Sequence, residues 1–121
     1  MVYRMDKETL TLNEYQEMAL ETAQYPEQFK VLYPALGITG EAGEVSDKIK
    51  KLIRDKGYTG GDITDVIDKE SIALELGDVL WYVSVLANDM GYSLEQIARM
   101  NYAKLSHRKQ HNKIGGSGDY R

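Results

Sequence analysis

Hydrophobic residues recur at helical spacing in four stretches of this chain, and no stretch shows the convincing alternation of a β-strand. The first stretch opens with the capping-box pattern Thr-x-x-Glu at Thr11 and ends before Tyr25 and Pro26. The second is expected to begin at Pro34, a residue favoured in the first helical turn, and to end at Gly57 after several basic residues.

The third and fourth stretches predict two further helices. The segment from about Asp68 to Gly91 is hydrophobic nearly all round, which is typical of a central, buried helix. Another capping box at Ser93 begins a helix that continues to about His111. The pattern as a whole therefore predicts an all-α fold, a four-helix bundle.

Between the helices, a polar and glycine-containing stretch over residues 56–68 predicts a long loop, and residues 113–121 form a glycine-rich tail. No repeat or domain boundary interrupts the chain, so residues 1–121 are expected to form a single domain.

Composition narrows the possible functions. The net charge of −4 disfavours binding to a nucleic acid polymer, and the absence of cysteine excludes disulfides and thiolate chemistry. The longest hydrophobic run falls far short of the ~20 residues that span a bilayer, and the first ten residues lack the hydrophobic region of a secretory signal. We therefore expect a cytoplasmic protein with no membrane partner.

Two acidic pairs are the candidate chemistry. Glu41 and Glu44 lie on the second predicted helix, Glu75 and Asp78 on the third, and each pair has i,i+3 spacing that places both carboxylates on one helix face. Each pair borders hydrophobic positions, where carboxylates are costly to bury unless they are paired or bind a metal. An oxygen-only ligand set favours a hard ion, Mg²⁺ or Mn²⁺.

A structural explanation of the acids competes with the metal site. Glu41 and Glu44 could be solvated, or the acids could form ion pairs with Lys48, Lys50 or Lys51.

A basic edge lies on the fourth predicted helix, beside its hydrophobic stripe. Asn101, Lys104 and Arg108 share this edge, and their side chains are suited to phosphate. The alternative for these three residues is a solvated basic face. Together with the acids, they indicate a site for a phosphate-bearing ligand.

These motifs, taken in order, resemble the all-α MazG-like nucleoside triphosphate pyrophosphohydrolases. The similarity lies in Glu41-x-x-Glu44 within Gly-Glu-Ala-Gly-Glu-Val, and in Glu75-Leu-Gly-Asp-Val-Leu-Trp-Tyr. It continues in Asn101-x-x-Lys104-Leu-x-x-Arg108 and in the closing Gly-Gly-Ser-Gly-Asp-x-Arg, and it covers roughly residues 33–121.

The resemblance implies a reaction and a set of roles. Water would attack a (d)NTP between its α- and β-phosphates and release a nucleoside monophosphate and pyrophosphate. The four acids would bind Mg²⁺, for which Mn²⁺ could substitute. The site residues implied are Glu41, Glu44, Glu75 and Asp78 as metal ligands and catalytic groups, with Lys48, Asn101, Lys104 and Arg108 on phosphate or sugar.

The chain also departs from the family pattern. The gap between the acidic pairs, residues 45–74, is longer than usual, and Gly40 stands where many relatives carry a further Glu that could act as general base. The general base, the preferred nucleobase and the preferred sugar therefore stay open.

Two other functions compete with this one. A phosphoribosyl-ATP pyrophosphohydrolase shares the fold and metal chemistry, although the glycine-rich end of the chain argues against it. A non-catalytic helical interaction module is disfavoured by the presence of all four acids.

We also expect a homodimer or homotetramer. The third predicted helix is hydrophobic on more sides than three neighbours from one small chain can cover. Leu74 and Trp81, placed away from the acidic stripe, are candidates to contact a second protomer. The resemblance points the same way.

Overall fold

The computed structural model describes residues 3–120, and all of its regular secondary structure in that range is helical. No strand occurs among the described residues, so the all-α class is confirmed. The elements are α1 Leu12–Glu21, the short 3₁₀ helix η1 Glu27–Phe29, α2 Leu32–Lys56, α3 Lys69–Asp89 and α4 Leu94–Gln110.

The expected helix ends are largely confirmed by their capping contacts. Complete capping boxes begin α1 at Thr11 and α4 at Ser93. The side chain of Asp68 caps α3 by accepting a hydrogen bond from the backbone N–H of Ser71 at 3.1 Å. Gly57 ends α2 in the left-handed conformation, with φ 66°.

The start of α2 differs from the expectation. The helix begins at Leu32, so Pro34 is its third residue, where the missing N–H is still one of the unpaired groups of a first turn. No side chain caps this end; instead Val31 turns the chain with φ 67°. Its backbone N–H donates to Asp89 Oδ2 at 3.0 Å, and the hydroxyl of Tyr25 donates to the same oxygen at 2.7 Å. A contact from the end of α3 therefore decides where α2 starts.

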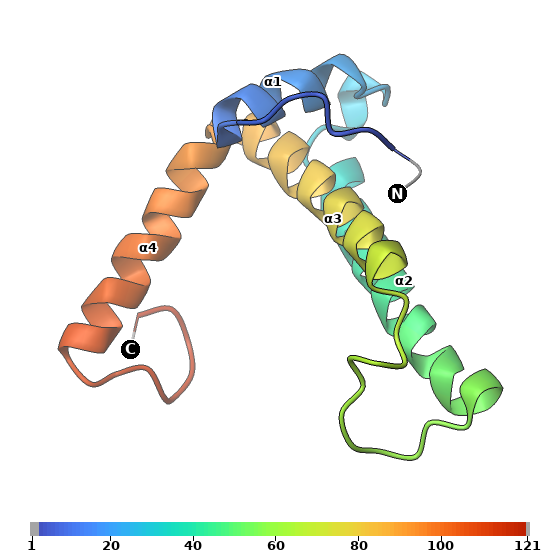
Figure 1. The fold of residues 1–121 in the computed structure, drawn as a ribbon. Coiled ribbons are helices and arrows are strands. Elements are labelled where there is room, and N and C mark those ends of the chain that lie inside the picture. The colour runs from blue at the N-terminus through green and yellow to red at the C-terminus, as the bar shows by residue number, and fades with distance from the viewer. Residues whose placement is uncertain (1–2, 121) are drawn as a thin grey trace.

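Helices α2 and α3 form an antiparallel hairpin joined by the loop over residues 57–68. At the end opposite this loop, α4 leaves α3 as a separate arm, so that the two arms form a V with its apex there (Figure 1). Gln16 of α1 holds this junction together. Its side-chain amide donates to the carbonyls of Ser84 (3.0 Å) and Tyr92 (3.2 Å) and accepts from the N–H of Leu94 (3.0 Å). Because Gln16 is buried, these bonds fix how α1, α3 and α4 meet.

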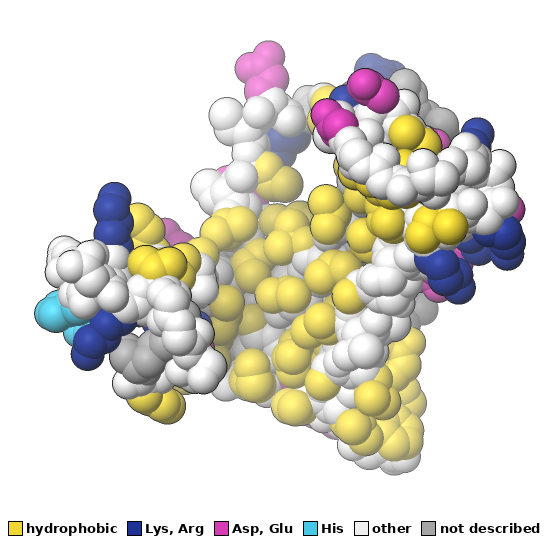
Figure 2. All heavy atoms as spheres, turned by 90° about the horizontal axis from the view of Figure 1, so that it is seen from below, with side chains coloured by type: hydrophobic (Ala, Val, Ile, Leu, Met, Phe, Trp, Pro, Cys, Tyr) yellow, Lys and Arg dark blue, Asp and Glu magenta, His cyan; other side chains and the backbone are white. Residues whose placement is uncertain are grey.

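The hydrophobic core of one chain is small and lies at this junction. Among the described residues, the buried hydrophobic side chains are Ala19, Val85, Ala87 and Leu94, together with Pro34 near the start of α2. Helix α3 is central but, contrary to expectation, not buried along its length, because α4 diverges and leaves Leu74, Leu76 and Leu80 between 38% and 56% exposed. Figure 2 shows hydrophobic side chains gathered across the hollow between the two arms.

Candidate metal centre

Three of the four predicted acids converge where α2 packs against α3. Glu41 comes from α2, and Glu75 and Asp78 come from successive turns of α3. One carboxylate oxygen from each lies within 4.8 Å of the others. Glu44 is exposed and stands outside this group of three, one turn along α2 from Glu41. The hairpin therefore assembles the acidic group from residues that are more than thirty positions apart in sequence.

The electrostatics of this group are unfavourable without a cation. Burial, and then the negative charges of Asp78 and Glu75, raise the pKa of Glu41, and Glu44 adds a smaller effect in the same direction. The Glu75 side chain is only 16% exposed, so water screens its charge incompletely. The charge of the group is thus only partly compensated by the protein.

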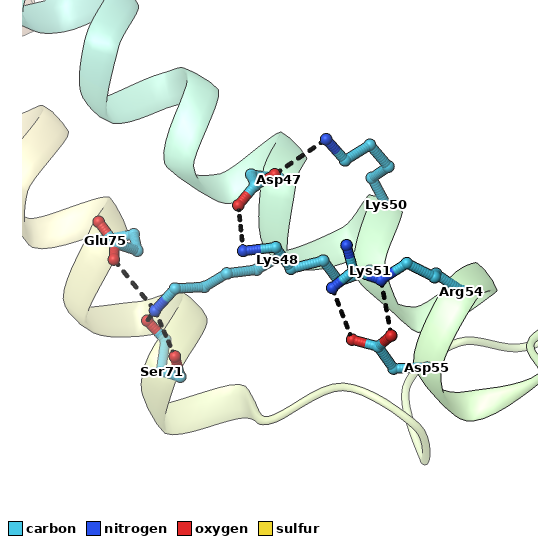
Figure 3. A network of polar contacts seen from close by, with 8 residues as sticks. All are labelled: Asp47, Lys48, Lys50, Lys51, Arg54, Asp55, Ser71 and Glu75. Atoms are coloured by element: carbon cyan, nitrogen blue, oxygen red, sulfur yellow. Dashed lines mark hydrogen bonds and ion pairs between the residues drawn. The ribbon is translucent and has the colours of Figure 1, made fainter.

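Lys48 supplies part of that compensation. Its ammonium lies 3.0 Å from Glu75 Oε1 and donates to the hydroxyl of Ser71 (Figure 3). This is one of the ion pairs that the structural explanation of the acids anticipated. Lys50 and Lys51 pair instead with Asp47, one turn away and outside the acidic group, as Figure 3 also shows.

Aromatic side chains form one wall beside the acids. A recess of about 320 Å³ is lined by Glu41, Asp78 and three residues that the sequence analysis did not assign to the site: Thr22, Trp81 and Tyr82. Trp81 donates its indole N–H to the hydroxyl of Thr22 at 2.8 Å. Its ring also packs edge-on against the ring of Tyr82, with 4.9 Å between the ring centroids.

Trp81 therefore lies beside the acidic stripe, and the expectation that it faces away was wrong. The sequence did contain a signal for part of this wall, because the i,i+4 spacing of Asp78 and Tyr82 places both on one helix face.

Gly37 allows this wall to form. A Cβ atom at this position of α2 would overlap the ring of Tyr82, approaching its Cζ to 2.6 Å. The ring thus packs directly on the α2 backbone one turn before Glu41. This close approach explains why a glycine stands here, although glycine inside a helix costs about 1 kcal/mol relative to alanine.

The basic edge predicted for the fourth helix lies on α4, and one of its three residues is less exposed than expected. Asn101 is exposed and Lys104 half-buried, as an edge position requires. Arg108 is only 6% exposed, because the tail folds back over it. Its guanidinium donates to the carbonyl of Gly118 at 3.0 Å and lies 3.4 Å from Asp119 Oδ1. The alternative explanation, a solvated basic face, was therefore wrong for Arg108.

The acids and the basic edge lie on different arms of the molecule. Asp78 is about 16 Å along α3 from Asp89, and Lys104 is about 15 Å along α4 from Leu94, at 1.5 Å per residue. Both distances are measured from the apex where the arms diverge (Figure 1). Within one chain, Lys48 is the only predicted cation of the described residues that contacts the acidic group.

The donor set of the acidic group suits a hard divalent cation. Carboxylate oxygens on two packed helices are the ligands that Mg²⁺ and Mn²⁺ prefer. A cation would also relieve the mutual repulsion that raises the pKa of Glu41. The residues present therefore fit a metal, with Glu41, Glu75 and Asp78 as the group already drawn together.

Comparison with known proteins identifies the family. Residues 31–112 match the family model described as the MazG nucleotide pyrophosphohydrolase domain. The chain is also 42% identical over 113 residues to the Gene 37 protein of Mycobacterium phage L5, covering 88% of this chain and 96% of that protein. No solved structure matches. The chain belongs to the MazG nucleotide pyrophosphohydrolase family.

The matched range contains the site. It begins at the turn before α2, ends just after α4, and includes all eight predicted site residues. In the part of the chain that the structure describes, no helix is long and hydrophobic enough to cross a bilayer.

Proposed function

We propose that this protein is a Mg²⁺-dependent nucleotide pyrophosphohydrolase that cleaves (d)NTPs between the α- and β-phosphates. Water adds at phosphorus, the α–β anhydride bond breaks, and the products are a nucleoside monophosphate and pyrophosphate. The observation that carries the proposal is the convergence of Glu41, Glu75 and Asp78 on the α2–α3 hairpin. Family membership supports it independently.

Each site residue then has a role. Glu41, Glu75 and Asp78, with Glu44 at the exposed edge, would hold the cation, and Mn²⁺ could replace Mg²⁺. When bound, the ion supplies electrostatic stabilisation of the phosphate charge. Lys48, held beside Glu75, places a positive charge at the margin of the acidic group, where a phosphate would otherwise be repelled.

The experiment is a panel of nucleotides incubated with Mg²⁺, with monophosphate, diphosphate, pyrophosphate and phosphate resolved as products. We expect monophosphate and pyrophosphate in equal amounts, and no turnover with a chelator. Asp78→Asn should lower kcat/KM by at least about 100-fold, whereas Glu17→Gln, which removes an exposed charge on α1, should not. Orthophosphate plus diphosphate would refute the bond assignment, and absence of turnover on the whole panel would favour a non-catalytic module.

We also propose that the working unit is a homodimer, alone or within a homotetramer. Two features of the single chain support this: the hydrophobic hollow between its arms, and the separation of the basic edge from the acids. A second copy seated in the hollow would cover exposed side chains of α3 such as Leu74. It could also bring Lys104 of one chain toward the acids of the other, where opposite charges attract.

Subunit mixing tests the shared site. Glu75→Gln removes an acid and Lys104→Ala removes a basic residue, so each homodimer should be impaired. After subunit exchange, half of the dimers are mixed and one of their two sites is intact, so activity should recover to about a quarter of wild type. Failure to recover, with exchange verified by mass spectrometry, would show that each chain completes its own site. A monomer in sedimentation at micromolar concentration would exclude the dimer itself.

A further inference from the structure

The last half of α4 and the tail form a second charged site, separate from the acidic group. Lys104 Nζ lies 2.9 Å from Asp119 Oδ1, and Arg108 Nη2 lies 3.4 Å from the same oxygen. Two positive side chains thus converge on a single oxygen of one carboxylate. This is the arrangement in which cationic side chains hold a phosphate oxygen.

Arg108 is unusual because its hydrogen-bonding capacity is only partly used. Its side chain is 7% exposed, yet its Nε–H finds no hydrogen-bond partner among the described residues. A buried donor without a partner is uncommon, since it loses its bonds to water and gains none in return. A guanidinium is built to hold an oxyanion through two N–H groups at once.

There is room for an anion at this place. A recess of about 290 Å³ is lined by Lys104, Arg108 and Asp119, together with His107 and Tyr120. A larger one, of about 490 Å³, adjoins it and includes Asn101. Asn101, Lys104 and Arg108, the predicted substrate-binding residues of α4, therefore all border the position that Asp119 occupies.

Among the described residues, the Asp119 side chain is held only by contacts that an anion could replace. Its side chain is 71% exposed, and it stands in a tail whose glycines Gly116 and Gly118 adopt positive φ. Lys104, and then Arg108, hold the pKa of Asp119 below its ordinary value, so the carboxylate is charged at neutral pH. Because the Asp119 end of both ion pairs is exposed to water, these pairs contribute little to stability, and a more highly charged anion competes with them effectively.

We propose that Asp119 is an internal stand-in for a substrate phosphate. In the free protein it occupies the anion position between Lys104 and Arg108, and the phosphate end of a nucleotide, or pyrophosphate, displaces it. The tail then competes with substrate for the basic edge. The inference rests on the proposed function for the identity of the anion, but the competition can be measured without turnover.

The experiment is calorimetric titration of the whole protein with inorganic pyrophosphate, with a chelator present so that the acidic group cannot take part through a metal. Asp119→Asn keeps the shape of the side chain and removes its charge. We expect this variant to bind pyrophosphate about three- to tenfold more tightly than wild type, because no carboxylate has to be displaced. Asp119→Glu keeps the charge and should bind as wild type does.

Two further variants locate the effect. Asp65→Asn removes an exposed carboxylate from the loop between α2 and α3, so it controls for the change in net charge and should shift affinity less than twofold. Adding Lys104→Ala to Asp119→Asn should abolish the gain. Equal or weaker binding by Asp119→Asn, or no measurable binding by any variant, would overturn the proposal and make Asp119 a clasp for the tail. These results stand whether or not the protein hydrolyses nucleotides.

Discussion

Removing one charge from the acidic group should stabilise the metal-free protein and weaken its response to Mg²⁺. Glu41→Gln preserves the size of the side chain while ending its repulsion with Asp78 and Glu75. A substitution at a functional site can raise stability where the site holds groups that destabilise the fold. Here the cause is specific, because carboxylates that lie this close together repel one another unless a cation joins them.

The magnitude follows from the geometry. Two unit charges 4.8 Å apart, the outer limit within the group, repel by about 0.9 kcal/mol in water and about 3.5 kcal/mol at an effective dielectric constant of 20. Lys48 offsets the charge of Glu75, so the contact with Asp78 dominates. Because Asp78 is exposed, we expect a value near the lower limit, about 1 kcal/mol. For a chain of this length, that raises Tm by about 3 to 5 °C.

The assay is thermal unfolding followed by circular dichroism, first with a chelator and then with excess Mg²⁺. Wild type should gain about 2.7 kcal/mol at a Mg²⁺ concentration 100 times Kd, and Glu41→Gln should gain much less. The two proteins should therefore exchange rank between the two conditions. Glu17→Gln, the control on α1, should follow wild type in both. A Glu41→Gln variant that is less stable without metal, or that gains as much from Mg²⁺, would refute the reasoning.

The same group predicts how metal-free stability depends on pH. The folded protein raises the pKa of Glu41 above the ordinary 4.5, so the folded state binds this proton more readily than the unfolded state. Stability therefore falls as pH rises from about 4.5 through the raised pKa and is level above it. Urea unfolding with a chelator across this range should show the decline in wild type, and Glu41→Gln should lack this contribution. An identical pH profile in both would contradict it.

Two further predictions concern packing and the start of α2. Gly37→Ala should destabilise by about 1 to 3 kcal/mol and change the near-ultraviolet dichroism, because its Cβ overlaps the Tyr82 ring. Gly43→Ala, where the new atom meets nothing within 4 Å, should instead stabilise by up to about 1 kcal/mol; equal effects would contradict the close approach. Asp89→Ala should cost about 2 kcal/mol in urea unfolding, since two hydrogen bonds to a carboxylate are lost. Tyr25→Phe removes one of them and should cost about half; no loss in either variant would show that α2 begins without this contact.

The sequence by itself determined the features that depend on neighbouring residues. Capping boxes at Thr11 and Ser93 are local, so the beginnings of α1 and α4 could be predicted from a few letters. The i,i+3 spacing of Glu75 and Asp78 places both on one face of any regular helix, wherever that helix lies. Family motifs consist of the same short patterns, and the match over residues 31–112 confirms the family that they indicated.

Only the tertiary structure decided how these faces meet. Nothing local says that Glu41 joins Glu75 and Asp78 while Glu44 stays outside, because the rotation of α2 against α3 is set by packing along the whole hairpin. Arg108 is buried by a tail that begins several residues later, and α2 starts at Leu32 because Asp89, on the far end of α3, accepts the N–H of Val31. Contacts between distant segments depend on the summed packing of many side chains, which helical periodicity alone does not specify.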